Sequence, residues 1–326
     1  TILGIDMSSA FDTINRRKLM EICSTFLESD ELKLIRILLA DTSLSIFCGD
    51  KSTTFETIVG TPQGDSLSPI LFIIYLEAAL RTLRPLLTPS QTISPNEMIY
   101  ADDVDFIYRK EEDALKDLPI ISNQLQQFNL KVNESKTEIT TVNRTKEGWQ
   151  KTRKLGSLLD CKEDITRRKS LAIAAYNSMT KIWIRKQKLS EEKLLQLYNS
   201  LVLPVLTYNC STWGVDRQQM KTLDTFHRKQ LRRLLGIKWE DKVSNEELYH
   251  RCHCNPLSHT ITNMRWKLFG HVLRRDDTIP GQVAMDSYFE DQGKPKYRGR
   301  CPTNIPICLQ KDLASLQEYT PYTDHS

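Results

Sequence analysis

Residues 99–107 carry the most chemically informative pattern in the chain. Asp102 and Asp103 are adjacent there, and apolar residues flank them in the run Ile-Tyr-Ala-Asp-Asp-Val-Asp-Phe-Ile. Neighbouring carboxylates repel each other, and a short apolar hairpin offers no compensation for this repulsion unless a divalent cation binds. A third carboxylate, Asp6, ends another apolar run at residues 1–6. The three aspartates are therefore candidates for metal-assisted phosphoryl transfer.

Nucleotidyl transfer needs an activated hydroxyl, a stabilised phosphorus centre and a neutralised leaving pyrophosphate. Two divalent ions about 4 Å apart can supply all three. Magnesium uses few carboxylates together with waters and phosphate oxygens, so aspartates from two facing strands are chemically sufficient. An Asp-Asp pair alone is more often a polar turn than a metal site. The metal-site interpretation therefore depends on the other motifs. Asp12 and Asp105 lie nearby and are interpreted as solvated or structural.

Three motifs follow one another in the first third of the chain. They are Asp-Met-Ser-Ser-Ala-Phe-Asp at 6–12, Thr-Pro-Gln-Gly at 61–64 with Ser68-Pro69, and Tyr-Ala-Asp-Asp at 100–103. In this order they resemble the palm motifs of reverse transcriptases, most closely those of non-LTR (LINE-like) retrotransposons. The resemblance implies an RNA-directed DNA polymerase that adds dNTPs to a DNA 3′-OH on an RNA template. It assigns catalysis and the binding of two Mg²⁺ ions, with Mn²⁺ as a substitute, to Asp6, Asp102 and Asp103.

The same resemblance implies roles for three further side chains. Phe11 matches the aromatic steric gate that excludes a ribose 2′-hydroxyl, although a core phenylalanine is the alternative. Gln63 matches a glutamine beside the incoming nucleotide, and its flanking glycines let the backbone approach a substrate closely. Lys136, in Asn-Glu-Ser-Lys-Thr at 133–137, matches a lysine that serves the departing pyrophosphate. An ordinary exposed turn lysine is the alternative there.

Basic residues concentrate in the second half of the chain. Residues 1–150 carry 15 Lys/Arg and 22 Asp/Glu, whereas residues 151–326 carry 30 and 19. An acidic first half suits a cation site, and a basic second half suits a polyanion such as nucleic acid. Residues 151–188 hold eleven basic against three acidic residues, and residues 217–238 hold seven against one. A solvated basic face without function is the alternative.

Nucleic-acid contacts are predicted at two places in this basic half. Leu155-Gly156 resembles the primer-grip turn that holds the growing 3′ end. The helical segments contribute basic residues that would follow phosphates. The predicted contacts are Leu155, Gly156, Arg167, Arg168, Lys169, Arg228, Lys229, Arg232 and Arg233.

The pattern predicts an α+β fold: a palm with an antiparallel sheet and packed helices, then a mainly helical part. The predicted domains are a palm at 1–160, a helical thumb at 161–240 and a C-terminal helical extension or connector at 241–326. Ser8 and Ser9 predict a helix start that continues to about residue 27, and Ser68 predicts the N-cap of a helix over 69–84. A hairpin is expected at 97–109 and a helix at 112–129. After Arg275 only one short helix, at 307–316, is expected.

Membrane, disulfide and zinc interpretations are weak. No apolar run reaches the ~20 residues that span a bilayer. Eight scattered cysteines show no disulfide-framework spacing, which indicates free thiols in a reducing, intracellular compartment. The sequence does not distinguish between the nucleus and the cytoplasm. Cys252, Cys254 and His259 match known zinc spacings poorly.

A complete reverse transcriptase would carry finger elements before Asp6, so the chain is expected to be a fragment of a longer polyprotein whose independent activity is open. Its expected partners are an RNA template, a DNA primer, dNTPs and the remainder of that polyprotein. One alternative is a decayed or domesticated remnant that binds nucleic acid without catalysis. Another is an RNA-dependent RNA polymerase, against which Phe11 and the Thr-Pro-Gln-Gly turn argue.

Overall fold

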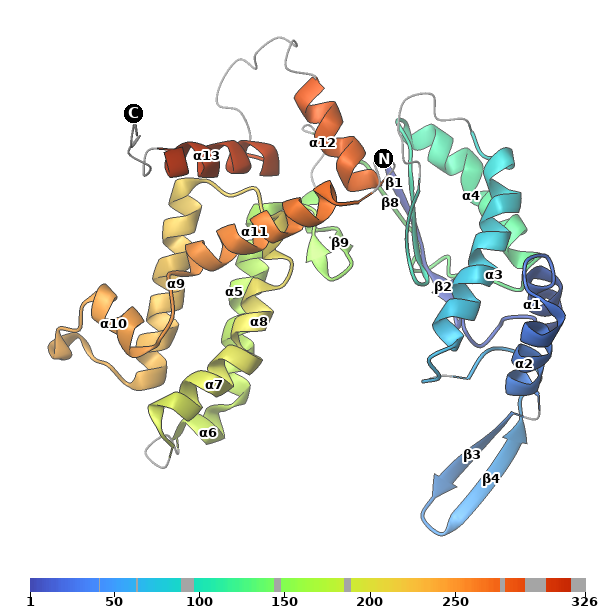
Figure 1. The fold of residues 1–326 in the computed structure, drawn as a ribbon, viewed down its shortest axis with the longest axis horizontal. Helices are drawn as coiled ribbons and strands as arrows, with labels where there is room; N and C mark the ends of the chain where they lie inside the picture. The colour runs from blue at the N-terminus through green and yellow to red at the C-terminus, as the bar shows by residue number, and fades with distance from the viewer. Residues whose placement is uncertain are drawn as a thin grey trace, which may run out of the picture. The chain divides into compact units, whose positions relative to one another are not determined.

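The structure is a computed structural model of the 326-residue chain. It describes residues 1–40, 42–62, 64–88, 97–143, 148–184, 189–275, 279–290 and 303–317. The chain divides into two compact units, residues 1–146 and 147–326 (Figure 1). The first combines an antiparallel sheet with helices and the second is mainly helical, which confirms the predicted α+β class. The division falls before the predicted boundary at 160, so residues 147–160 belong to the helical unit.

An antiparallel four-stranded sheet, with strand order β5-β6-β1-β8, organises the first unit. Ile5 pairs with Val104 on one side of β1, and Gly4 pairs with Glu138 on the other. After β1 the chain continues into β2, which pairs with β7 in a separate two-stranded sheet. The strands are β1 Ile2–Ile5, β2 Met7–Ser8, β5 Glu97–Tyr100, β6 Asp103–Ile107, β7 Lys131–Val132 and β8 Glu138–Thr140.

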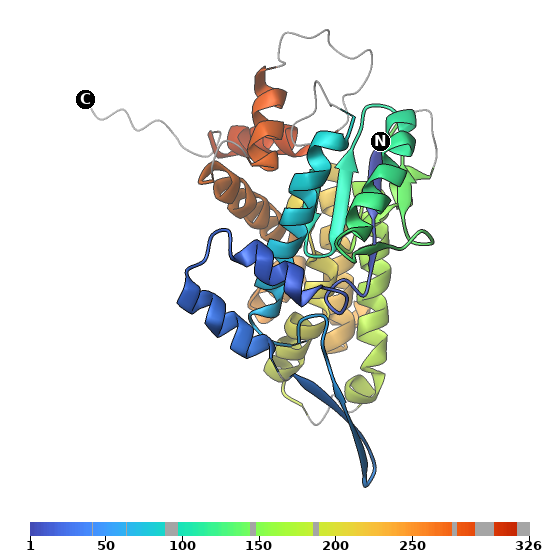
Figure 2. The same cartoon turned by 90° about the vertical axis from the view of Figure 1, so that its right-hand side faces the viewer.

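Helices cover one side of this sheet. Figure 1 shows α1 (Arg16–Cys23), α3 (Ser68–Leu83) and α4 (Glu111–Gln126) all on that side. Alternate residues of a strand point to the same face. On the helix-covered face, these strand residues pack against the almost fully apolar α3 and form the core of the unit. α2 (Ser29–Leu39) follows α1, and a hairpin of β3 (Ser43–Cys48) and β4 (Lys51–Glu56) projects from the unit (Figures 1 and 2).

The second unit begins with a small hairpin and continues as helices around one core. That core includes Tyr198, Trp213 and Ile261. None of the described helices is both long enough and apolar enough to cross a lipid bilayer. The elements are β9 Arg153–Lys154, β10 Ser157–Leu158, α5 Cys161–Ser178, α6 Thr180–Ile184, α7 Glu191–Leu201, α8 Leu203–Thr207, α9 Arg217–Leu235, α10 Asn245–Arg251, α11 Leu257–Leu273, α12 Pro280–Glu290 and α13 Ile305–Gln317. Single 3₁₀ turns lie at Arg84–Leu86, Trp149–Lys151, Cys210–Thr212 and Trp239–Asp241.

Three predicted elements differ from the structure. The helix predicted from Ser8 and Ser9 begins only at Arg16, because Ser8 pairs with β7 and Ser9 has a left-handed φ of 49°. Ser68 is the first helical residue rather than the cap, and its hydroxyl donates to the Pro62 carbonyl at 2.6 Å. The expectation of one short helix after Arg275 is wrong, since α12 starts at Pro280, and proline is tolerated in the first turn of a helix.

Candidate functional site

The pairing of β1 with β6 brings two of the three candidate aspartates to the same end of the sheet. Ile5 is paired with Val104, so the next residues in this register are Asp6 and Asp103. Side chains directly opposite each other on antiparallel strands point to the same face, with Cβ atoms roughly 5 Å apart. Asp6 and Asp103 are thus neighbours at the end of the ladder, although 97 positions separate them in the sequence.

These aspartates lie on the face of the sheet that points away from the helices. Leu3 and Ile5 are 0% and 2% exposed and belong to the helix-covered core. Asp6, one position further along the strand, points to the other face, because successive residues alternate. Asp103 is exposed, and Asp105, half-buried and paired with Gly4, lies on that same face. We call the face that carries Asp6, Asp103 and Asp105 the open face.

Asp102 lies in the two-residue turn between β5 and β6. Tyr100 pairs with Asp103, which leaves only Ala101 and Asp102 to connect the strands. Ala101 has a φ of 53°, a conformation that costs a non-glycine residue free energy and is enriched at functional sites. The predicted hairpin is confirmed, and its tip presents an exposed Asp102 beside Asp103.

The environment of Asp6 fits a cation. Its Oδ2 atom is buried and accepts no hydrogen bond from the described residues, while the Lys136 Nζ atom lies 3.5 Å away. Among the described residues no three Asp, Glu, His or Cys groups are arranged to hold a metal ion. Magnesium, however, is commonly held by one or two carboxylates completed by waters and substrate phosphates. Asp6 and Asp103 fit such a two-carboxylate site, with Asp102 next to it.

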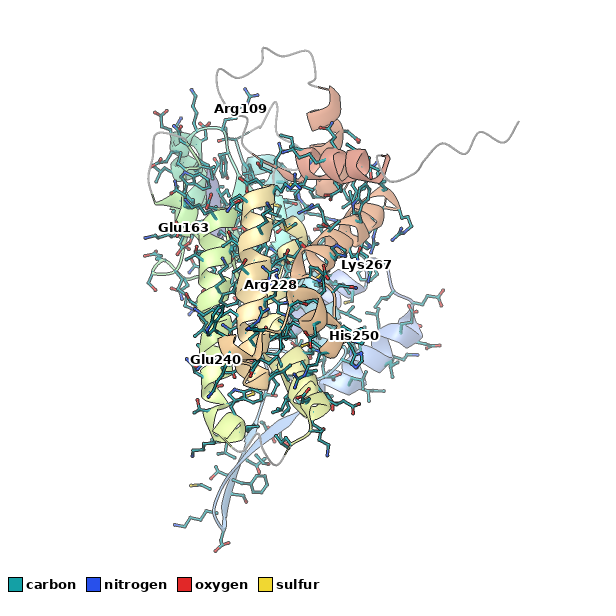
Figure 3. The ribbon with its side chains drawn as sticks, turned by 90° about the vertical axis from the view of Figure 1, so that its left-hand side faces the viewer. Arg109, Glu163, Arg228, Glu240, His250 and Lys267 are labelled. Atoms are coloured by element: carbon teal, nitrogen blue, oxygen red, sulfur yellow. The ribbon has the colours of Figure 1, made fainter. Side chains whose placement is uncertain are left out.

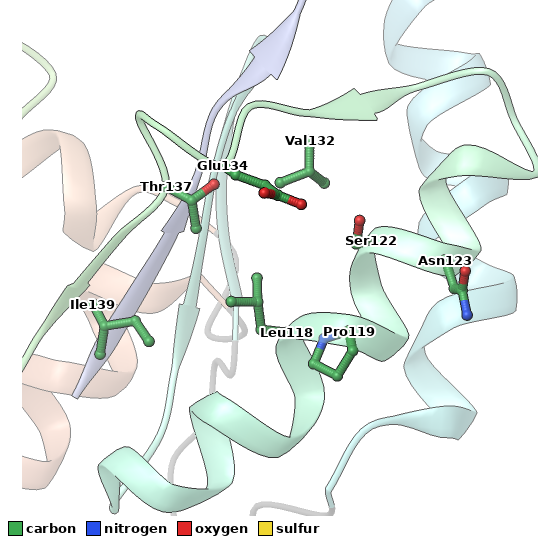
Figure 4. A pocket seen from close by; sticks show the side chains of 8 residues that line it. All are labelled: Leu118, Pro119, Ser122, Asn123, Val132, Glu134, Thr137 and Ile139. Carbon is green, nitrogen blue, oxygen red and sulfur yellow. The ribbon is translucent and has the colours of Figure 1, made fainter.

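Lys136 is presented by a tight turn between β7 and β8. The carbonyl of Asn133 accepts from the backbone N–H of Lys136 at 3.1 Å and from that of Thr137 at 2.9 Å. The N–H of Asn133 in turn donates to the Asp6 carbonyl at 2.8 Å. A cavity of about 520 Å³ lies behind this turn, between α4 and the strands, and Glu134 and Thr137 line it together with Leu118 (Figure 4).

The turn that precedes α3 packs on the segment after Asp6. The backbone N–H of Gly60 donates to Ile14, and that of Thr61 donates to Phe11. A Cβ atom on Gly60 would lie 2.7 Å from the Asp12 carbonyl oxygen, and its φ is +74°, so this position requires glycine. Phe11 is half-buried and stacks on Phe72, with ring centroids 4.4 Å apart. Gln63 lies outside the described residues.

Arg16 holds this turn in place, and sequence reasoning did not identify it. Its Nε atom donates to the Gly60 carbonyl at 2.8 Å, and its Nη1 atom donates to the carbonyls of Thr57 and Leu39 at 2.7 and 2.8 Å. Burial lowers the pKa of this guanidinium. No local signal identifies such a residue, because its partners lie 23 to 44 positions away.

The Leu155-Gly156 turn connects β9 and β10 in the second unit. Both residues have positive φ values, 46° and 79°, as a tight two-residue hairpin requires. Arg167 donates to the Gly156 carbonyl at 2.9 Å, and Arg168 donates to the same oxygen. Tyr208 donates from its hydroxyl to the Leu155 carbonyl at 2.8 Å. Side chains from α5 and from Tyr208, directly after α8, thus bond to both residues of this turn, and Leu155 is exposed at its tip.

The predicted nucleic-acid contacts differ in accessibility. Arg168 is only 6% exposed, and its guanidinium pairs with the buried Asp164 carboxylate inside the unit. Lys229 and Arg233 are exposed, and Arg233 lies over the Tyr176 ring at 4.5 Å. The others are half-buried: Arg167, Lys169, Arg228 and Arg232.

The half-buried cations are held by neighbours within the helical unit. Figure 3 shows Arg228 on α9, which runs beside α5. Arg228 donates to the Tyr249 hydroxyl at 3.1 Å, and Arg232 donates to the Asn245 Oδ1 atom at 2.9 Å. Lys169 lies 5.8 Å from the Phe226 ring centre, and burial lowers its pKa.

The helical unit holds two further ionisable features, a buried histidine and a pair of neighbouring thiols. His227 is 3% exposed, neither ring nitrogen has a hydrogen-bond partner among the residues that the structure describes, and burial lowers its pKa to about 4. A hydrogen bond between the thiols of Cys252 and Cys254 lowers the pKa of Cys254 and raises that of Cys252. The described residues around them form no metal-binding group.

Comparison with known proteins gives three similarities. An uncharacterised transposon-derived protein of Caenorhabditis elegans is 22% identical over 241 residues, which cover 66% of this chain and 84% of that protein. An apo telomerase from Candida tropicalis, truncated from its C-terminal domain, is 21% identical with a TM-score of 0.38, over 46% of this chain and 32% of that chain. A telomerase from Candida albicans in complex with a fragment of telomeric RNA is 12% identical with a TM-score of 0.32. This match covers 90% of this chain and 50% of that chain. The chain therefore spans half or less of either telomerase.

The family comparison covers the site itself. The family described as reverse transcriptase (RNA-dependent DNA polymerase) matches residues 1–179, which is more than half of the chain. The matched region contains the three aspartates, the Lys136 turn and the Leu155-Gly156 hairpin. With these residues in the positions described above, the chain belongs to the reverse transcriptase family of RNA-dependent DNA polymerases.

Proposed function

We propose that this chain is the palm, thumb and C-terminal extension of an RNA-directed DNA polymerase from a non-LTR retrotransposon. One observation carries the proposal: the register of β1 and β6 makes Asp6 and Asp103 neighbours on the open face. In this proposal residues 161–240 act as the thumb and residues 241–326 as a connector. The transposon-derived relative supports a mobile-element origin.

The reaction joins the primer 3′-oxygen to the α-phosphorus of a dNTP and breaks that phosphorus's bond to pyrophosphate. Bound Mg²⁺ or Mn²⁺ would activate the hydroxyl and neutralise the phosphates. Asp6 and Asp103 would hold the ions, and Asp102 at the hairpin tip would complete the site. Lys136, within 3.5 Å of Asp6, would sit where charge develops on the leaving pyrophosphate.

Selection of the nucleotide is proposed for the segment that packs under the Gly60 turn. Phe11 would act as the steric gate against ribonucleotides, and Gln63 would contact the incoming nucleotide. Support for the gate comes from the fixed position of Phe11: its ring stacks on Phe72, and its carbonyl accepts from Thr61 at 3.0 Å. A ring held in this way can exclude a hydroxyl without losing its own packing.

Primer and template contacts are proposed for the second unit. The rigid Leu155-Gly156 turn would hold the primer end, and the exposed Lys229 and Arg233 would contact phosphates. Arg167, Lys169, Arg228 and Arg232 would contribute less, because each is half-buried. Arg168 is proposed only as a residue that positions the turn.

Primer extension on an RNA template tests the proposal. The full chain, supplied with Mg²⁺ or Mn²⁺, should extend a DNA primer with dNTPs and discriminate against NTPs. Asp103→Asn should lower the rate at least a hundredfold, because a carboxylate ligand is lost. Asp105→Asn, a matched change on the same face, should have a small effect. Activity that survives Asp103→Asn would remove the site assignment.

A nucleic-acid-binding remnant without catalysis is the second candidate. The exposed cations of the helical unit favour it independently of the aspartates. In the extension assay this candidate predicts no product from any variant, together with undiminished binding of an RNA–DNA hybrid.

A further inference from the structure

We propose that Lys136 is an internal counter-ion for Asp6, one that occupies the place of the divalent cation until the cation binds. This inference rests on the proposed metal site and assigns Lys136 a second role, before chemistry. Lys136 would set the affinity of the site for metal and would move away from Asp6 when metal enters.

The turn between β7 and β8 brings the two groups together. β2 pairs with β7, the Asn133 N–H donates to the Asp6 carbonyl at 2.8 Å, and the chain then turns through Lys136 before β8 pairs with β1. The Lys136 Nζ atom lies 3.5 Å from Asp6 Oδ2, and in the part of the chain that the structure describes that buried oxygen has no hydrogen-bond donor. A carboxylate oxygen shielded from water needs a compensating positive charge. Lys136 supplies that charge from 130 positions along the chain.

The turn structure keeps the ammonium group near Asp6. The carbonyl of Asn133 accepts three hydrogen bonds, from the N–H groups of Lys136 and Thr137 and from the Thr137 hydroxyl. The N–H of Asn133 donates to the Asp6 backbone. The backbone around Lys136 is therefore fixed relative to Asp6, so the ion pair orders little more than the lysine side chain.

Release of Lys136 from Asp6 requires little rearrangement. Its side chain is 66% exposed, so the ammonium can turn into water without breaking a packed core. The cavity of about 520 Å³ behind the turn leaves Glu134 and Thr137 without close packing on that side (Figure 4). A cation at Asp6 Oδ2 and the Lys136 ammonium cannot share that oxygen at close range, because like charges repel. Metal and lysine therefore compete.

Metal binding measured without catalysis tests this competition. Mn²⁺ is titrated into the full chain, and free Mn²⁺ is followed by electron paramagnetic resonance. Lys136→Met should bind Mn²⁺ about two- to fivefold more tightly than the natural chain, as expected for the loss of a partly exposed ion pair. Lys131→Met is the matched control: it removes the same charge from β7, where Lys131 pairs with Ser8 and not with Asp6. Its affinity should change clearly less.

Chemical labelling provides a second readout. Acetylation of Lys136 by an acylating reagent, measured by peptide mass spectrometry, should become several-fold faster at saturating Mn²⁺, because the ammonium is released. Acetylation of Lys131 should keep its rate. Circular dichroism of each variant shows whether the fold is retained.

The outcomes separate this inference from the proposed function. Mn²⁺ binding that is lost in Asp6→Asn but unchanged in Lys136→Met leaves the metal site in place and overturns the counter-ion role. Equal gains in Lys136→Met and Lys131→Met also overturn it, since they indicate only a general charge effect. Absence of Mn²⁺ binding to the natural chain contradicts the metal site itself, and the inference with it.

Discussion

Burial determines which arginines of the helical unit can serve a nucleic acid. Arg168 and Asp164 are 6% and 1% exposed, and the Asp164 carboxylate also accepts from Leu158 and Trp213, each at 3.0 Å. Lys229, on α9, is exposed. The sequence shows both as basic residues in basic helices, and only the packing separates their roles.

Replacement of Arg168 should therefore destabilise the helical unit. Arg168→Met leaves a buried carboxylate without its nearest internal cation, and we expect a loss of about 3 kcal/mol in the free energy of unfolding. Lys229→Met, the surface control, should change it by less than about 0.5 kcal/mol. Urea unfolding followed by tryptophan fluorescence measures both. Similar values for the two variants would contradict the buried role of Arg168.

His227 makes the stability of the same unit depend on pH. Burial lowers its pKa from 6.5 to about 4, so the folded state keeps the ring neutral where the unfolded chain takes up a proton. Stability then rises with pH between these two values, because the unfolded state binds more protons there. The contribution is complete above pH 6.5 and is lost as the pH falls towards 4.

His227→Phe should remove most of this acid sensitivity. Between pH 7.5 and 5.0 the free energy of unfolding of the natural chain should fall by about 2 kcal/mol through this histidine. The variant should not show this fall. The phenylalanine also removes two buried nitrogens that lack partners. Urea unfolding at the two pH values measures the difference, with His259→Phe, an exposed position, as control. An unchanged loss in His227→Phe would show that other groups control the acid response.

At the scale of elements, contact between the Gly60 turn and the Asp12 backbone fixes how α3 enters the first unit. Arg16 closes the same junction from α1 through four carbonyls, those of Leu39, Thr57, Val59 and Gly60. The Gly60–Asp12 contact joins residues 48 positions apart, and the Arg16 hydrogen bonds span 23 to 44 positions. The junction supports the Phe11 segment and the start of α3 at once.

Gly60→Ala should weaken this junction specifically. The added Cβ atom would lie 2.7 Å from the Asp12 carbonyl oxygen at a φ of +74°, and we expect a cost of roughly 2 kcal/mol or more. Gly64→Ala also has a positive φ, but beyond its chain neighbours no atom of the described residues lies within 4 Å of its added Cβ, so only about 1 kcal/mol is expected. Hydrogen exchange of peptides from β1 and α1 measures the effect locally. Equal protection in both variants would contradict the close approach.

Elements with a local signal could be predicted from the sequence. Capping residues mark both ends of α9: Asp216 is its N-cap, and Gly236, with a φ of 72°, ends the helix. The hairpin around Asp102 and the apolar α3 are equally local. The start of α1 could not be predicted, because the pairing of Ser8 with Lys131 overrides a sequence that suits an N-cap. The Gly/Pro-rich sequence after Arg275 favours loops and gives no local signal for α12, which begins at Pro280.

The residues of the candidate site also divide into those with a local sequence signal and those without one. Motif order was sufficient to select Asp6, Asp102 and Asp103 as candidates. The ion pair of Lys136 with Asp6 and the support of the turn by Arg16 depend on strand register and chain packing, which no local pattern encodes. The burial of Arg168 depends in the same way on how the β9–β10 hairpin packs on α5.

At the scale of the whole molecule, charge is divided between the halves of the chain. The first 150 residues are acidic overall and the remainder is basic, within a net charge of +4. Such a division suits a protein that binds cations in one part and a polyanion in the other. Binding of nucleic acid through exposed cations releases counter-ions and therefore weakens with salt.

The salt dependence of binding should report the exposed cations. Fluorescence anisotropy with a labelled RNA–DNA hybrid at several KCl concentrations gives the slope of log affinity against log salt. Lys229→Gln and Arg233→Gln should each reduce the magnitude of this slope by about 0.7 to 0.9. Lys51→Gln, on the exposed β4 strand of the acidic half, should leave it unchanged. Equal slopes in all variants would exclude α9 as the phosphate-contacting surface.

The convergence of Asp6 and Asp103 is tested most directly by a cross-strand disulfide. Asp6→Cys/Asp103→Cys should form a disulfide under mild oxidation, as detected by peptide mass spectrometry, because opposite residues on paired strands have Cα atoms within the range that a disulfide spans. Asp6→Cys/Asp105→Cys places the second thiol at a diagonal position and should cross-link poorly. Efficient linkage of positions 6 and 103 alone is the predicted result. Failure of that pair to link, or equal linkage of both pairs, would contradict the shared site.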